Sequence, residues 1–163
     1  MNTPVQCADV QLDFDAICAE IDAGQSSLLD LLTPKQLEIE LDPSFLRCVF
    51  GGRQWGKTTW SGAAHALAAL PGATSLAIAP TVTKARDLLL PGVEWLNKEA
   101  GAGIVYRAGD FRFDFPNGGK TQCMGMGTVR EAEKIRGFTP PFISIEECGT
   151  YKPDLLKFAI ESC

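Results

Sequence analysis

The pattern of apolar and polar residues predicts helices in the first part of the chain. Thr33-Pro34 is typical of a helix start, with Thr33 as the cap and Pro34 at the first helical position. A further helical stretch is expected over about 26–33. Before it, apolar residues recur close to helical spacing over 10–23, at Val10, Leu12, Phe14, Ile17, Cys18 and Ile21. Residues 1–30 are therefore expected to form a helical extension ahead of a domain that occupies 31–163.

From residue 45 onward, apolar runs alternate with helical stretches. Residues 45–50 and 75–79 are typical of strands, and Pro80 ends the second one. A run of small residues over 59–70 predicts a helix between these two strands. Residues 81–100 predict another helix, with a break near Pro91-Gly92.

The next segment has strand character. Three runs, 104–106, 111–115 and 120–124, are expected as strands. The sequence Pro116-Asn117-Gly118-Gly119 predicts a turn between the second and the third. Phe111, Phe113 and Phe115 alternate with polar residues and therefore share one face. A core-facing strand explains this pattern better than a base-stacking platform does.

Strands that alternate with helices predict an α/β fold, with a mostly parallel central sheet and helices on both faces. The last expected strand, 142–145, follows a charged helix or loop at 129–136. In such sheets, ligands bind at the carboxyl ends of the strands. The residues that follow 45–50 and 142–145 are therefore expected to lie near each other.

Residues 51–58 form a complete phosphate-binding loop sequence, G-x-x-x-x-G-K-[ST]. Its glycines permit close backbone approach to phosphate, and the N-terminus of the following helix adds an anion site. Lys57 is expected to pair with the β- and γ-phosphates, and Thr58 to give its hydroxyl to Mg²⁺. The motif predicts a P-loop NTPase, with these residues around the nucleotide: Gly51, Gly52, Arg53, Gln54, Trp55, Gly56, Lys57, Thr58 and Thr59.

Two acids directly follow the apolar run 142–145, as in the second signature of phosphate-loop NTPases. The first acid, Glu146, is expected to hold Mg²⁺ through water, and the second, Glu147, to orient and polarise the attacking water. The first acid is usually Asp, and Glu is one methylene longer. The division of roles between Glu146 and Glu147 therefore stays open.

Composition narrows the class of protein. With 45% hydrophobic and 21% charged residues the chain is typical of a globular domain, and its net charge of −5 argues against a surface that coats nucleic acid. No apolar run is long enough for a membrane span, and no secretory signal is recognised. The six cysteines form no C-x-x-C pair and His65 is the one histidine, which disfavours a zinc site. The cysteines are expected to be reduced thiols in a cytoplasmic setting. His65 is expected to be a packed or surface residue.

Several stretches in a set order go beyond a generic NTPase. They are Gln36 within Thr33-Pro34-Lys35-Gln36, Arg53 inside the loop, Ala77-Ile78-Ala79-Pro80-Thr81 with its helix, Phe113–Gly119 followed by Met124-Gly125, and Lys134-Ile135-Arg136-Gly137. Over about residues 30–152, the chain resembles the ATPase domain of the large terminase subunit of tailed bacteriophages, the DNA-packaging motor.

The resemblance implies that ATP is the nucleotide, that Gln36 reads adenine, and that hydrolysis drives double-stranded DNA into a procapsid. The implied partners are double-stranded DNA, a portal protein, a small terminase subunit and, in the full-length protein, further copies in a homo-oligomeric ring. No membrane is implied, and the implied setting of a viral protein is the cytoplasm of the host cell. An arginine is also implied at the γ-phosphate, either Arg53 in cis or Arg136 in trans. For Arg136, a surface salt bridge with Glu131 or Glu133 is an equal alternative.

Large terminase subunits continue with a coupling motif and a nuclease domain whose clustered acids bind two metals. No nuclease cluster is recognised in this sequence, so the ATPase domain is expected to be incomplete at its C-terminus. Two alternatives stay open. One is a helicase-like ATPase fragment that acts on DNA or RNA, and the other is a nucleotide-binding fragment that does not hydrolyse and serves in assembly.

Overall fold

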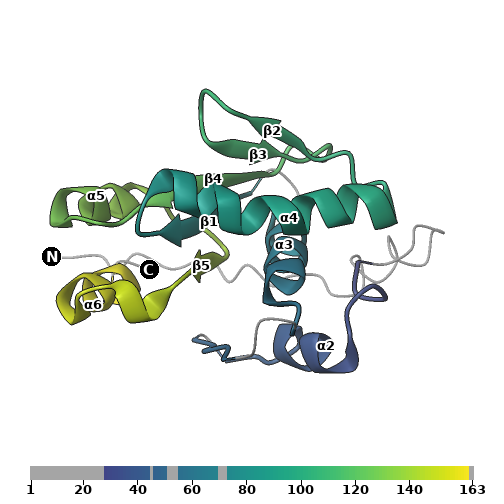
Figure 1. Cartoon of the computed structure of the whole chain (residues 1–163), viewed down its shortest axis with the longest axis horizontal. Helices are drawn as coiled ribbons and strands as arrows, with labels where there is room; N and C mark the ends of the chain where they lie inside the picture. Colours follow the sequence, from purple (N-terminus) through teal and green to yellow (C-terminus); the bar gives the residue numbers. More distant parts are fainter. Residues whose placement is uncertain (1–27, 45, 51–54, 70–72, 162–163) are drawn as a thin grey trace, which may run out of the picture.

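The computed structural model describes residues 28–44, 46–50, 55–69 and 73–161. Within them, helices lie on both faces of a five-stranded sheet, which confirms the α/β class (Figure 1). The expected helix over 10–23 lies outside the described residues. No helix in the described ranges is both long and apolar enough to cross a membrane.

The sheet has the strand order β2-β3-β4-β1-β5. The central strand β1 (Thr74–Ala79) pairs in parallel with β4 (Lys120–Gly125) and with β5 (Ile143–Ile145). The strands β2 (Val105–Arg107) and β3 (Arg112–Asp114) are antiparallel to their neighbours. The expectation of a mostly parallel sheet therefore holds for the half formed by β4, β1 and β5. The other half is antiparallel because short turns, and not helical crossovers, join its strands.

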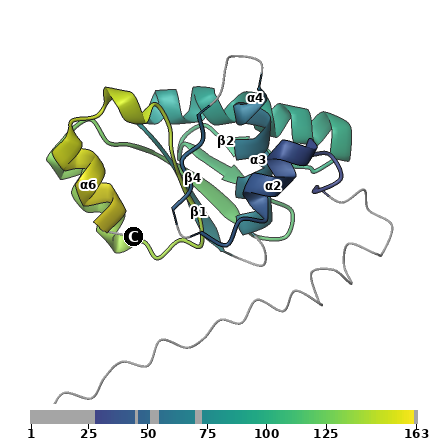
Figure 2. The same cartoon turned by 90° about the horizontal axis from the view of Figure 1, so that it is seen from below.

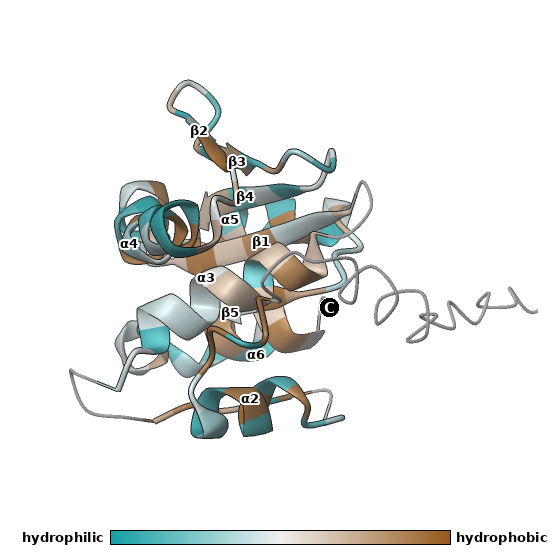
Figure 3. Cartoon of the chain, turned by 90° about the vertical axis from the view of Figure 1, so that its right-hand side faces the viewer, coloured by the Kyte–Doolittle hydropathy of each residue, from teal (hydrophilic) through white to brown (hydrophobic). Residues whose placement is uncertain are grey.

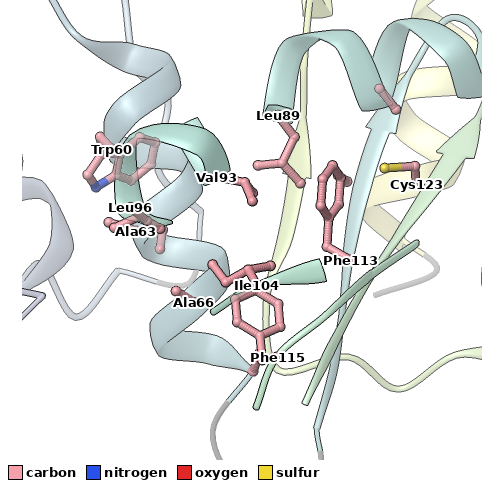
Figure 4. Close-up of a cluster of buried hydrophobic side chains, with 14 of the residues drawn as sticks. Trp60, Ala63, Ala66, Leu89, Val93, Leu96, Ile104, Phe113, Phe115 and Cys123 are labelled. Carbon is pink, nitrogen blue, oxygen red and sulfur yellow. The ribbon is translucent and has the colours of Figure 1, made fainter. Parts of the chain in front are cut away.

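The helices α3 (Lys57–Ala68) and α4 (Val82–Ala100) cover one face of the sheet. Their apolar side chains meet Phe113 and Phe115, which are buried, as the alternating pattern predicts (Figure 4). Phe111 packs at the margin of this cluster. Around its axis, α4 carries both hydrophobic and hydrophilic residues, as expected of a helix with one face on the core (Figure 3).

The opposite face of the sheet is covered by α5 (Val129–Glu133), the 3₁₀ helix η2 (Lys134–Gly137) and α6 (Pro153–Glu161). Leu76 and Ile78 point to this side, whereas Ala77 and Ala79 point to α3 and α4, because side chains alternate along a strand. A short 3₁₀ helix, η3 (Cys148–Thr150), links β5 to α6. Figure 2 shows α6 and α3 on opposite sides of β1 and β4.

The expected strand over 45–50 is wrong in its described part. Residues 46–50 belong to no strand, and the side chain of Phe50 is 92% exposed. The segment is held instead by Arg47, whose Nη1 donates to the carbonyl oxygens of Ile39 at 2.6 Å and Glu40 at 3.0 Å. Apolar character alone does not make a strand, because a strand is stabilised by the ladder of its neighbour.

The helix α2 (Pro34–Glu40) begins as predicted. Thr33 and Gln36 form a capping box in which each side chain accepts from the other residue's backbone N–H. The stretch expected as a helix over 26–33 forms turns in its described part, 28–32. Thr33 is extended at φ −65° and ψ 156°, as expected for a residue before proline, and this conformation separates the turns from α2.

The predicted break in α4 at Pro91-Gly92 is also wrong, because α4 continues through both residues. Pro91 is exposed, whereas Gly92 is buried against α3. A Cβ built on Gly92 would lie 2.3 Å from the carbonyl oxygen of Thr58. The glycine therefore permits α3 and α4 to approach closely at the start of α3.

Candidate functional site

The end of the phosphate-loop motif is built as a helix N-terminus. Gly56 has φ 82°, in the left-handed region that glycine adopts readily, and α3 begins at Lys57. Gly56 is the N-cap of α3 and offers no side chain to the first backbone N–H groups of the helix. Lys57 is exposed, and the residues half-buried around it are Trp55, Thr58 and Thr59. Four predicted nucleotide contacts, Gly51, Gly52, Arg53 and Gln54, lie outside the described residues.

Glu146 lies at the carboxyl end of β5, close to this helix. Its Oε1 accepts a hydrogen bond of 3.2 Å from the hydroxyl of Ser61 in α3. Burial raises the pKa of Glu146, while the Ser61 hydrogen bond and the charge of Lys57 oppose that shift. The structure therefore brings Lys57, from the first motif, and Glu146, from the second, into one electrostatic environment.

Glu147 has a different environment from Glu146. Its carboxylate is partly exposed and lies 3.2 Å from Nζ of Lys84, in the first turn of α4. Its backbone has φ 55°, and its carbonyl oxygen accepts from the hydroxyl of Thr150 at 2.8 Å. Non-glycine residues in this region are uncommon and cluster at functional sites. The two acids are thus directed to different partners, Glu146 to α3 and Glu147 to α4.

Gln36 is buried against the loop motif. Its Nε2 donates to the carbonyl oxygen of Gly56 at 3.0 Å, and its Oε1 accepts from the backbone N–H of Thr33 at 2.8 Å. Both ends of the amide are therefore engaged: Oε1 in the capping box of α2, and Nε2 in holding α2 against the start of α3. A second hydrogen bond between α2 and α3 runs from Nε1 of Trp60 to Oε2 of Glu40, at 3.0 Å.

Arg136 is exposed and lies in η2, across the sheet from α3. The structure does not place it beside Lys57 within the chain. Among the described residues, no three His, Cys, Asp or Glu side chains gather as a metal cluster. The residues of the two motifs whose oxygen atoms could hold Mg²⁺ are Thr58, through its hydroxyl, and Glu146, through its carboxylate.

Sequence reasoning missed Ser61 and Lys84. Ser61 lies one helical turn after Lys57, so a helix starting at Lys57 directs both to the same side. That spacing is a usable signal once the helix start is known. Lys84 has no such signal, because its contact with Glu147 depends on how α4 and β5 are placed. A comparison of the chain with protein-family models and with curated proteins finds no match.

Proposed function

We propose that this chain is a Mg²⁺-dependent ATPase domain of the terminase large subunit type. The observation that supports this most strongly is the convergence of two motifs. Lys57 belongs to a complete phosphate-loop sequence and begins α3, whose Ser61 contacts Glu146 at 3.2 Å, and Glu146 follows the apolar strand β5. The charge of Lys57 also favours the charged form of Glu146. Two independent sequence signatures of NTP hydrolysis thus meet at one edge of the sheet, at the carboxyl ends of β1 and β5.

The residues present fit a bound nucleotide with its metal. The N-terminus of α3, with glycine as its N-cap residue, suits an anion, and Lys57 supplies a positive charge for the β- and γ-phosphates. Thr58 and Glu146 would hold Mg²⁺, directly or through water, and the bound metal would neutralise charge on the phosphate oxygens. Glu147 would accept a proton from the attacking water and orient it. Arg53 in cis or Arg136 in trans would meet the developing charge on the γ-phosphate.

The finer assignment rests on the resemblance in sequence. The order of Gln36, the arginine-bearing loop, Ala79-Pro80-Thr81, the hairpin and Arg136-Gly137 supports a motor that moves double-stranded DNA into a procapsid. The proposed partners are DNA, a portal protein, a small terminase subunit and neighbouring copies in a ring. The exposed position of Arg136 is compatible with a role toward such a neighbour.

One observation favours the non-hydrolysing alternative for the chain alone. The carboxylate of Glu147 is paired with Lys84 at 3.2 Å, so the group proposed to orient water is engaged with α4. Hydrolysis requires this contact to open or to tolerate a water beside it. A chain that binds ATP without turning it over would retain this pair.

The test compares ATP binding with ATP hydrolysis in the full chain and three variants. Lys57→Ala is expected to lose binding, and Glu147→Gln to retain binding and lose at least about a hundredfold in turnover. Glu94→Gln, an exposed acid on α4, is the matched control and is expected to behave as the unmodified chain. Stimulation of turnover by double-stranded DNA supports the motor. Absence of binding by the unmodified chain overturns the proposal, and binding without turnover leaves the assembly role.

A further inference from the structure

A buried polar network lies one helical turn below the candidate site. His65 of α3 is fully buried, and its Nδ1 is 2.9 Å from the hydroxyl of Ser75 in β1. Its Nε2 is 2.9 Å from the hydroxyl of Ser144 in β5. The hydroxyl of Ser75 is also 2.9 Å from that of Thr121 in β4. One histidine thus connects the helix that follows the phosphate loop to the central strands.

The hydrogen bonds of this network assign the tautomer of His65. Burial lowers its pKa to about 3, so the ring is neutral at neutral pH and carries one N–H. With the proton on Nδ1, the ring donates to Ser75, and Ser75 donates to the carbonyl oxygen of Lys120 at 3.4 Å. Ser144 then donates to Nε2, and Thr121 donates to Ser75. Every polar group in the network has a complementary partner in this arrangement.

The same helix and strand meet twice in succession. Ser61 contacts Glu146, and one turn later His65 contacts Ser144. Four helical residues rise about 6 Å and two strand residues about 6.6 Å, so the two contacts match in spacing. The edge of the His65 ring also meets Phe142, just before β5, with centroids 4.9 Å apart and planes at 77°. The position of Glu146 along α3 is therefore coupled to the contacts of His65.

We propose that His65 is a positioning residue for Glu146. By holding Ser144, it sets the register of β5 against α3, and with it the distance of the Glu146 carboxylate from Lys57 and Thr58. This inference rests on the proposed function, in which Glu146 and Thr58 hold Mg²⁺. The contact with Ser144 is the one that matters for Glu146, whereas the contact with Ser75 anchors the helix to β1.

Two amide substitutions separate these contacts. In His65→Gln the amide reaches the position of Nε2 and retains the bond to Ser144. In His65→Asn it reaches the position of Nδ1 and retains the bond to Ser75 only. Ser144→Ala and Ser75→Ala remove the same two contacts from the strand side, with smaller changes in the core. Each His65 variant retains one of the two histidine contacts, so loss of stability alone does not distinguish these two. Ser75→Ala removes contacts with His65, Lys120 and Thr121, whereas Ser144→Ala removes the contact with His65. The larger loss of stability is therefore expected in Ser75→Ala and the larger effect on Glu146 in Ser144→Ala.

Crystal structures of the variants measure the separation of Ser61 Oγ and Glu146 Oε1, and need no activity. The expected result is that this hydrogen bond persists in His65→Gln and Ser75→Ala and is broken in His65→Asn and Ser144→Ala. In solution, the Mg²⁺ concentration for half-maximal ATP turnover is expected to rise about tenfold in the second pair. Nucleotide affinity without Mg²⁺ should be unchanged in all four variants.

The proposal is overturned if His65→Asn and His65→Gln change the Ser61–Glu146 separation and the Mg²⁺ requirement equally. It is also overturned if neither quantity changes while thermal stability falls. If both His65 variants fail to fold, Ser144→Ala against Ser75→Ala decides the question in the same way. An unmodified chain that binds no nucleotide refutes the proposed function, and the crystallographic comparison then still decides whether His65 positions Glu146.

Discussion

The hydroxyl of Ser61 donates a hydrogen bond of 3.2 Å to Oε1 of Glu146, from a residue 85 positions away in the sequence. Burial raises the pKa of Glu146, and this hydrogen bond and Lys57 lower it. The two groups that favour the charged form of the acid after β5 therefore both come from α3, the helix that follows the phosphate loop.

Ser61→Ala is expected to raise the pKa of Glu146 further, because it removes a donor that stabilises the carboxylate. The acidic limb of the pH–turnover profile should then move to higher pH. A hydrogen bond to a charged group contributes about 1.5 kcal/mol, so the limb should move by roughly one pH unit. Ser75→Ala, a buried serine without contact to Glu146, is the control. An unmoved acidic limb in Ser61→Ala contradicts the assignment.

Gly92→Ala is expected to push α4 away from α3, because its Cβ would lie 2.3 Å from the carbonyl oxygen of Thr58. We expect the free energy of unfolding to fall by about 1–3 kcal/mol and the affinity for Mg²⁺-ATP to fall with it. Gly109→Ala is the matched control, since a Cβ there meets no atom within 4 Å. Urea titration and calorimetry measure both quantities. If the two variants have the same free energy of unfolding and the same affinity for Mg²⁺-ATP, α3 and α4 accommodate the added methyl group without loss of stability.

Gln36→Ala tests what the buried amide does. Its loss removes the acceptor of the Thr33 N–H and one of two donors to the carbonyl oxygen of Gly56, which keeps its bond from the N–H of Trp60. This should cost roughly 1–3 kcal/mol of stability. Because Gly56 precedes Lys57 directly, we expect ATP and GTP affinity to fall by the same factor. Adenine reading, which the resemblance implies, predicts a loss confined to ATP. Calorimetric titration with both nucleotides separates the two roles.

His65 predicts a pH dependence of stability. Its pKa falls from 6.5 to about 3 on burial, so the unfolded chain binds a proton that the folded chain does not. The stabilisation is complete above the unfolded pKa and is lost as pH falls toward 3, by up to about 1.4 kcal/mol per pH unit. Glu40 and Glu146, whose pKa values are raised chiefly by burial, contribute in the opposite direction. Urea unfolding at several pH values measures how the free energy of unfolding changes with pH in the unmodified chain and in His65→Gln. The variant should lack the part of this change that the histidine contributes. Parallel curves would mean that His65 is not buried as a neutral ring.

Elements with strong local signals could be predicted from the sequence. The helix start at Thr33-Pro34, the helix after the loop, the strand ended by Pro80 and the hairpin at Pro116–Gly119 are all present. Each depends on residues close together in the chain, through helix caps, backbone restrictions at proline and glycine, or side-chain alternation. The phosphate-loop motif is likewise a local pattern, and so is the acid pair after β5.

Other features depended on which segments pack together. Residues 46–50 have strand composition but no strand neighbour, and Pro91 sits in an unbroken α4 because its ring lies on the exposed side. Ser61 with Glu146, Lys84 with Glu147 and His65 with Ser144 join residues that are distant in sequence. Such pairs arise only when a helix and a strand take a particular register, which depends on the burial of both core clusters. The sequence by itself therefore determined the local elements and the kinds of residue at the site, and the tertiary structure decided which of these residues meet.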